Sequence, residues 1–144
     1  MTINDIKHAK IKAWVEEVVK MCQPDDVYVC DGTAAEYDRL MNKMVEAGLA
    51  TPLAKKPHSH LFRSVPSDVA RIEGRTYIAS VKQEDAGPTN NWIDPKELKA
   101  TMTGLYTGCM KGRTMYVIPF CMGPVGSPIS KNGIELTDSE YVVC

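Results

Sequence analysis

The 144-residue sequence lacks two glycine-rich signatures of nucleotide-binding enzymes. It contains no GxxxxGK[ST] segment, which would cradle phosphates in a P-loop, and no GxGxxG segment, which would indicate dinucleotide binding. We therefore do not expect this chain by itself to be a nucleotide enzyme of either type.

The sequence also lacks paired cysteines. Its five cysteines are an odd number and include no CxxC pair, which argues against both a disulfide framework and a zinc site. We expect most of them to be buried thiols, namely Cys22, Cys30, Cys109, Cys121 and Cys144.

Neither a strong net charge nor a long apolar run is present. Lys and Arg number 17 against 18 Asp and Glu, so the chain has no electrostatic footprint for nucleic acid or an anionic membrane. No apolar run approaches the ~18 residues of a membrane span, and the first residues are polar where a secretory signal would be apolar. The 44% hydrophobic fraction is ordinary for a soluble protein. These features predict one globular, cytoplasmic domain with no nucleic-acid or membrane partner.

Apolar side chains with helical spacing predict three longer helices. The first has an apolar face ending before Pro24, and the second, "TAAEYDRLMNKMVEAG", has a capping box at Thr33 and Glu36 with Gly48 at its C-terminal end. Asp94 caps the third, which we expect to direct Leu98, Met102 and Leu105 toward the core. The apolar face of the first helix consists of Ile11, Trp14, Val15, Val18, Val19 and Cys22.

Short runs of β-forming residues alternate with these helices. We predict strands at "VYVC", "TYIAS", "RTMYVIPF", "GIELT" and "EYVVC", a brief extended piece at "HLFR", and a short helix at "SDVARIEG". The order is not a strict βαβ alternation, so the predicted class is α/β or α+β with a mixed sheet and flanking helices.

Few residues suggest chemistry by themselves. Arg71 could hold a carboxylate or phosphate through its guanidinium fork, although a salt-bridged surface arginine is the more common role. His58 and His60 lack an evident third metal ligand and read as solvated loop residues. The "MGPVGSP" loop could form an anion nest but reads as a turn, and Lys111 with Arg113 gives a small solvated basic spot.

Three ordered segments carry a more specific signal. The stretch "NNWIDPKELKATMTGLYTGCMKGRTMYVIPFCMGPVGSPISKNGIELTDSEYVV", together with "VYVCDGTAAEYDRL" and "SDVARIEGRTYI", resembles the N-terminal region of GTP-dependent phosphoenolpyruvate carboxykinases. The resemblance runs from about Ile11 to Val143. It implies that residues 1–144 are a partial N-terminal domain on the substrate-binding side of such an enzyme.

The resemblance implies a function as well. The family converts oxaloacetate and GTP to phosphoenolpyruvate, GDP and CO2 in gluconeogenesis, with Mn2+ and Mg2+, usually as a monomer. The motif that reads "DVARIE" here assigns Arg71 the role of gripping the substrate anion. The family's nucleotide loop and metal ligands would lie beyond position 144, so we expect no catalytic, cofactor-binding or metal-binding residue in this chain.

The sequence departs from the family pattern at Cys121, Asn132 and Glu140, and at the His58 and His60 pair. These changes bear on packing and loop shape, because none of them is the substrate arginine. A polar Asn132 would need a hydrogen-bond partner if buried.

The sequence stops on what reads as a strand, and this predicts a fragment. The resemblance implies that the fragment is inactive alone, because the family's metal and nucleotide sites are needed for phosphoryl transfer. Two other interpretations stay open. One is a stand-alone, non-enzymatic module that binds a small anion, and the other is an assembly module that uses an exposed edge at residues 141–144.

Overall fold

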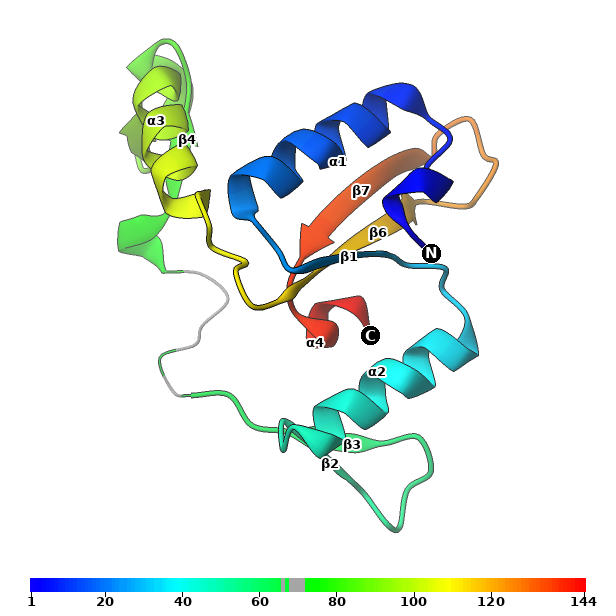
Figure 1. The fold of residues 1–144 in the computed structure, drawn as a ribbon. Helices are drawn as coiled ribbons and strands as arrows, with labels where there is room; N and C mark the ends of the chain where they lie inside the picture. Colours follow the sequence, from blue (N-terminus) through cyan, green and yellow to red (C-terminus); the bar gives the residue numbers. More distant parts are fainter. Residues whose placement is uncertain (66, 68–71) are drawn as a thin grey trace. The chain divides into compact units, whose positions relative to one another are not determined.

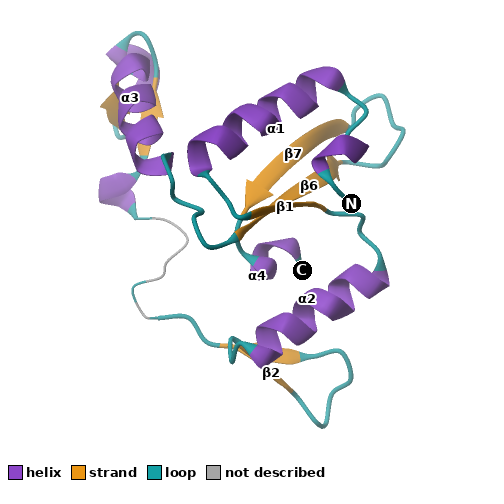
Figure 2. Ribbon diagram, viewed as in Figure 1, coloured by secondary structure: helices purple, strands orange, loops and turns teal. Residues whose placement is uncertain are grey.

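The computed structural model describes residues 1–65, 67 and 72–144 (Figures 1 and 2). Helices and strands are interleaved along the chain, which confirms the predicted mixed α/β class. In chain order the elements are η1 (Ile3–Asp5), α1 (Ala9–Cys22), β1 (Asp26–Val29), α2 (Ala34–Glu46), β2 (Ala50–Pro52), β3 (His60–Phe62), η2 (Glu73–Arg75), β4 (Tyr77–Ala79), η3 (Gln83–Ala86), β5 (Asn91–Ile93), α3 (Pro95–Tyr106), β6 (Thr114–Met122), β7 (Lys131–Thr137) and α4 (Glu140–Val143). None of the helices in these parts of the chain is long and apolar enough to cross a membrane.

The chain forms two compact units. Unit 1 comprises residues 1–63 and 108–144, and unit 2 comprises residues 64–107. Unit 1 contains a three-stranded sheet in the order β1-β6-β7, in which β1 runs parallel to β6 and β7 antiparallel to it. The sheet is therefore mixed, as predicted.

Helices cover both faces of the unit 1 sheet (Figure 1). On one face, Val15 of α1 packs against Val29 of β1 and Val117 of β6. On the other, Leu40 of α2 packs against Cys30 and Tyr116. Neighbouring residues of β6 thus serve opposite cores, because successive side chains of a strand point to opposite faces.

The predicted second helix is confirmed, with Gly48 after its end and with the Thr33 half of the predicted capping box. The Glu36 carboxylate accepts hydrogen bonds from the Asp31 and Gly32 amides and not from the Thr33 amide. Thr33 caps α2 by accepting a hydrogen bond from the Glu36 amide at 3.2 Å. At the other end, the Gly48 amide donates to Val45 O and the Leu49 amide to Met44 O, which is the hydrogen-bond pattern of a Schellman motif. Gly48 has a φ of +74°, a conformation that glycine adopts without strain.

Unit 2 is built from short elements. Strands β4 and β5 pair in parallel, and α3 follows β5 directly. Asp94 caps α3 by accepting hydrogen bonds from the amides of Lys96 and Glu97, as predicted. The expectation for Leu105 was wrong, because its side chain is 68% exposed within a helix that has no buried residue.

The end of the chain differs from its predicted strand. The "EYVVC" segment forms the short helix α4. Glu140 bonds to Lys43 and Tyr116, and Val143, three residues later on the same face, packs against the Leu40 core. These tertiary contacts outweigh the β-propensity of the valines.

Two smaller expectations also need correction. Cys22 and Cys30 are buried, but Cys109 and Cys121 are only partly buried and Cys144 is exposed. The predicted short helix at "SDVARIEG" lies mostly outside the described residues, and its described end forms the 3₁₀ helix η2.

Candidate functional site

The predicted substrate arginine, Arg71, lies outside the described residues. The backbone from Ile72 to Thr76 forms a hydrogen-bonded turn. Ile72 is extended and leads into η2, whose last turn is closed by hydrogen bonds from the Arg75 amide to Ile72 O and from the Thr76 amide to Glu73 O. The Thr76 hydroxyl adds a bond to Ile72 O at 2.8 Å. The carbonyl of Ile72, the residue after Arg71 in sequence, therefore accepts two hydrogen bonds that hold it in place.

Sequence reasoning missed the residue that anchors this turn. The Asn91 amide group donates to Glu73 O at 2.9 Å and to Thr76 O at 3.1 Å, so β5 holds both ends of η2. The sequence placed Asn91 at the start of the "NNWIDPKELK" stretch that resembles the family, but the spacing of an asparagine does not reveal a contact distant in sequence. Trp92 supports the same region by donating from its indole to Ser80 O at 2.9 Å.

The "MGPVGSP" loop connects β6 to β7 and forms a turn, as expected. Gly123 and Gly126 both have positive φ. The Ser127 amide donates to Pro124 O, the Ser130 amide to Ser127 O, and the Ile129 amide to the Ser127 hydroxyl. Because these amides bond within the loop, they are not free to form an anion nest.

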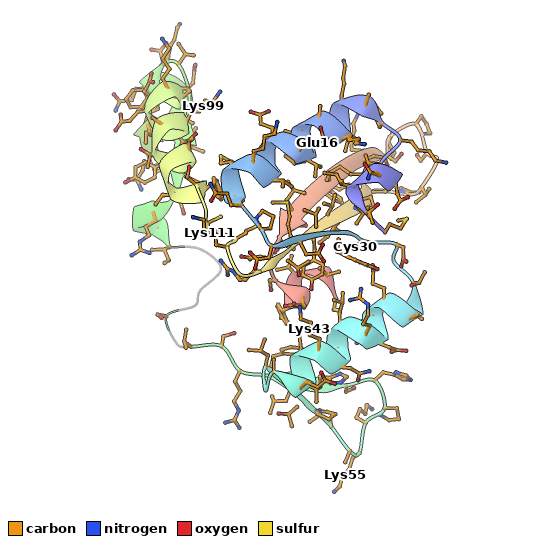
Figure 3. The ribbon with its side chains drawn as sticks, in the orientation of Figure 1. Glu16, Cys30, Lys43, Lys55, Lys99 and Lys111 are labelled. Carbon is orange, nitrogen blue, oxygen red and sulfur yellow. The ribbon has the colours of Figure 1, made fainter. Side chains whose placement is uncertain are left out.

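One of the two basic residues at 111–113 has a structural role. Arg113 forms an ion pair with Asp138 at 2.8 Å and donates to Cys109 O. Its guanidinium therefore ties the turn before β6 to the end of β7. Lys111 lies in that turn (Figure 3).

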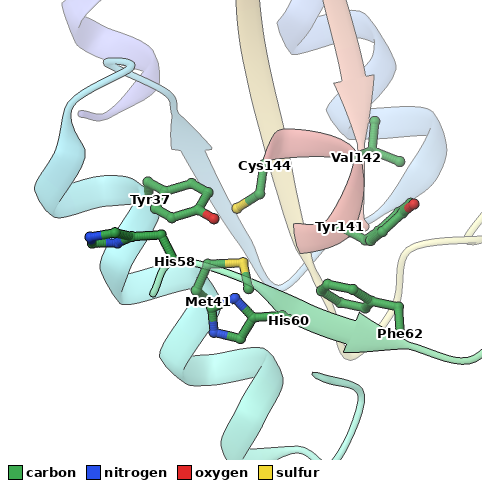
Figure 4. Close-up of a pocket in the computed structure, with 8 residues that line it drawn as sticks. All are labelled: Tyr37, Met41, His58, His60, Phe62, Tyr141, Val142 and Cys144. Carbon is green, nitrogen blue, oxygen red and sulfur yellow. The ribbon is translucent and has the colours of Figure 1, made fainter. Parts of the chain in front are cut away.

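Figure 4 shows a pocket of about 510 Å³ in unit 1. Phe62 and Tyr141 meet edge to face at its wall, with ring centroids 4.9 Å apart. The structure thus places His58 and His60, read from the sequence as solvated loop residues, at an aromatic pocket. Among the described residues no three His, Cys, Asp or Glu side chains gather as a metal ion would require. The lining residues are Tyr37, Met41, His58, His60, Phe62, Tyr141, Val142 and Cys144.

A polar triad attaches α4 to α2 and β6. Lys43, labelled in Figure 3, donates to Glu140 and to the Tyr116 hydroxyl, which itself donates to Glu140 at 2.9 Å. Burial would raise the pKa of Glu140, but the hydrogen bonds from Lys43, the backbone and Tyr116 bring that pKa below its ordinary value. The same hydrogen bond with Glu140 raises the pKa of Lys43. Glu140, which departs from the family pattern, thus holds α4 in place.

Two further residues that depart from the family pattern lie on neighbouring strands. Cys121 and Asn132 are cross-strand partners in the β6–β7 ladder. Asn132 is exposed, so its amide can be hydrated and needs no buried partner. Nothing in the structure explains why these two residues in particular are found there.

The architecture so far is that of an α/β scaffold whose connecting segments carry the candidate recognition residues. Residues 13–144 match the family described as the phosphoenolpyruvate carboxykinase N-terminal domain. The chain therefore belongs to this family, which confirms the resemblance found in the sequence.

Similar proteins from distant organisms agree. The chain is 71% identical over its whole length to a protein of Treponema pallidum (strain Nichols) named phosphoenolpyruvate carboxykinase [GTP]. It is 53% identical to proteins of the same name from Chlamydia trachomatis and Neocallimastix frontalis, each over 99% of this chain. The chain spans 23–24% of the length of these relatives.

Proposed function

We propose that this chain provides substrate-anion recognition in a phosphoenolpyruvate carboxykinase that converts oxaloacetate and GTP to phosphoenolpyruvate, GDP and CO2. The observation that carries the proposal is the 71% identity to a GTP-type carboxykinase over all 144 residues. In an organism that makes glucose from smaller acids, this reaction would serve gluconeogenesis. A cytoplasmic location and a monomeric state belong to the same proposal.

Arg71 is the residue to which we assign the substrate anion. Oxaloacetate and phosphoenolpyruvate carry several negative charges, and a guanidinium stays protonated and offers two parallel hydrogen bonds to a carboxylate or phosphate. The fixed turn at residues 72–76 supports this role, because an anchored backbone next to the arginine lowers the entropy lost when substrate is positioned.

Other parts of the reaction are not assigned to this chain. Phosphoryl transfer depends on metal ions and on a positioned nucleotide. The described residues hold no metal-ligand cluster, so no step proposed for them uses a metal. We assign Mn2+, Mg2+ and GTP to the regions of the relatives that this chain does not match.

Titration with phosphoenolpyruvate tests the binding role. One arginine with a few backbone donors should give a Kd of about 1 mM at best, worth about 4 kcal/mol. Arg71→Ala should abolish this binding, while Arg75→Ala, an exposed arginine in η2, should leave it nearly unchanged. Equal binding by the unaltered chain and the Arg71→Ala variant would contradict the assignment.

An assay of GTP-dependent oxaloacetate decarboxylation to phosphoenolpyruvate tests which parts of the reaction this chain can perform. We expect the 144-residue chain to show no turnover with Mn2+ and Mg2+ supplied. Metal-dependent turnover would show that the chain contains catalytic parts that we assign elsewhere. Micromolar binding that requires Arg71 would instead favour the stand-alone anion-binding module.

A further inference from the structure

Two cysteines distant in sequence lie together in unit 1. Cys22 is the last residue of α1, and Cys109 lies in the turn that leads into β6. Cys109 packs against the buried cluster formed by Cys22, Met110 and Met115. The proposed substrate recognition uses neither thiol.

The backbone holds these two residues side by side. The Gly108 amide donates to Met21 O at 2.8 Å, and the Met110 amide donates to Cys22 O at 3.0 Å. Cys109 therefore lies between two residues that are each bonded to the end of α1. A disulfide needs Cα atoms about 4.4–6.8 Å apart, and adjacent hydrogen-bonded segments provide such separations.

The side chains agree with the backbone. Burial, followed by a hydrogen bond between its thiol and that of Cys109, raises the pKa of Cys22 to about 11. The packing of Cys109 against the cluster that contains Cys22 places the two side chains in the same part of the core. The remaining cysteines have other neighbours: Cys30 packs with Leu40 and Tyr116, and the Cys121 thiol donates to Gly123 O.

We propose that Cys22 and Cys109 form a reversible intramolecular disulfide when the protein meets a peroxide. Cys109 is the more accessible of the two thiols, so it reacts first. This makes the pair a redox-sensitive modification site.

The reaction balances in two steps. The Cys109 sulfur attacks one peroxide oxygen, the O–O bond breaks, and a sulfenic acid and one water form. The Cys22 sulfur then attacks the Cys109 sulfur, the S–O bond breaks, and the hydroxide leaves as a second water with the proton from Cys22. Two thiols are oxidised by two electrons and one peroxide is reduced to two waters.

The bond would close a long loop. It would join the end of α1 to the second residue after unit 2, so the closed segment would contain β1, α2 and the whole of residues 64–107. Cross-linking so long a loop restricts the unfolded chain, which should raise the thermal unfolding midpoint. Added dithiothreitol should return the midpoint to its starting value.

Peptide mapping after treatment with hydrogen peroxide tests the proposal. Cleavage before Asp25 and Asp26 separates Cys22 from Cys30, and added trypsin cuts after Lys111 and Arg113 and so separates Cys109 from Cys121. The linked peptide then identifies its own partners. We expect a Cys22–Cys109 peptide about 2 Da lighter than the sum of its reduced halves. The count of free thiols should fall from five to three.

Two variants control the result. Cys109→Ser should keep its remaining thiols reduced and lose the shift in unfolding midpoint, whereas Cys121→Ser, also partly buried, should form the linked peptide normally. The proposal is overturned if both Cys22 and Cys109 stay open to alkylation after peroxide treatment. It is equally overturned if Cys109 is carried to sulfonic acid without a linked peptide.

Discussion

The two units of this protein are stabilised by different means. The four buried apolar clusters found in the described parts of the chain lie in unit 1, where α1 and α2 enclose the sheet. Among the described residues of unit 2, Ala86 is the one buried apolar side chain. Hydrogen bonds donated by Asn91 and Trp92 and accepted by Asp94 hold its short elements in place of a core.

This difference suggests that unit 1 is the scaffold and that unit 2 carries the proposed recognition residue. Burial of apolar surface contributes most of the free energy of folding, so unit 1 should carry the stability of the chain. Unit 2 contains the proposed substrate arginine and relies on individually weaker polar contacts. Substitutions of the same kind should therefore have different consequences in the two units.

The largest contrast is expected for leucine truncation. Leu40 has no exposed surface in unit 1, and Leu40→Ala should lower the free energy of unfolding by about 2–5 kcal/mol, because it leaves a cavity. Leu105→Ala in unit 2 should change it by less than about 0.5 kcal/mol. Urea unfolding followed by circular dichroism measures both. Comparable losses would remove the distinction between the units.

Two glycines should respond with opposite signs. Gly48→Ala forces a side chain into positive φ and should cost about 1 kcal/mol, although a new Cβ would meet no atom within 4 Å. Gly104 lies inside α3 in open space, so Gly104→Ala should stabilise that helix by up to about 1 kcal/mol. Thermal unfolding of the two variants should shift in opposite directions.

Asn91 provides a test confined to unit 2. Asn91→Ala removes both bonds to η2 and should speed amide hydrogen exchange at Arg75 and Thr76, with a local cost of about 1 kcal/mol. Exchange in β6 should not change. Faster exchange in β6 as well would show that the two units open together.

The smallest stabilisation should come from the hydrogen bonds of Glu140, and acid should remove it. The pKa of Glu140 is lowered in the folded state, so its stabilisation is present above the unfolded value and is lost as pH falls through the folded value. Lys43 is more than half exposed, so Glu140→Gln should cost less than about 1 kcal/mol at pH 7. At pH 3 the difference between the two proteins should shrink.

Glu84→Gln is the matched control in unit 2. Glu84 pairs with Lys82 at 3.4 Å, and both side chains are strongly exposed. We expect no measurable change at either pH, because water screens such pairs. A pH-dependent loss at Glu84 equal to that at Glu140 would contradict the role of burial in the triad.

Local signals explain how much the sequence revealed. The capping residues Thr33 and Asp94 and the glycine at 48 act within a few residues, so both ends of α2 and the start of α3 could be predicted. Long-range contacts had no such signal. The strand predicted at "EYVVC" became a helix through Lys43 and Tyr116, which lie far away in the sequence.

The candidate site divides in the same way. Arg71 was found through a motif resemblance, and its role remains a proposal. The anchor at Asn91 and the Cys22–Cys109 pair depend on which segments meet in the fold, and the spacing of these residues in the sequence does not encode that.

The position of β6 in the sheet also sets an order of folding. Its partner β7 follows after one loop, but its other partner, β1, precedes it by most of the chain, with Val29 paired to Val117. During synthesis, α1, β1 and α2 leave the ribosome long before the strand that completes their cores. Their apolar faces therefore stay uncovered until β6, which contains Val117, has been made. We expect the sheet to form late and the protein to fold slowly, because these contacts join residues distant in sequence.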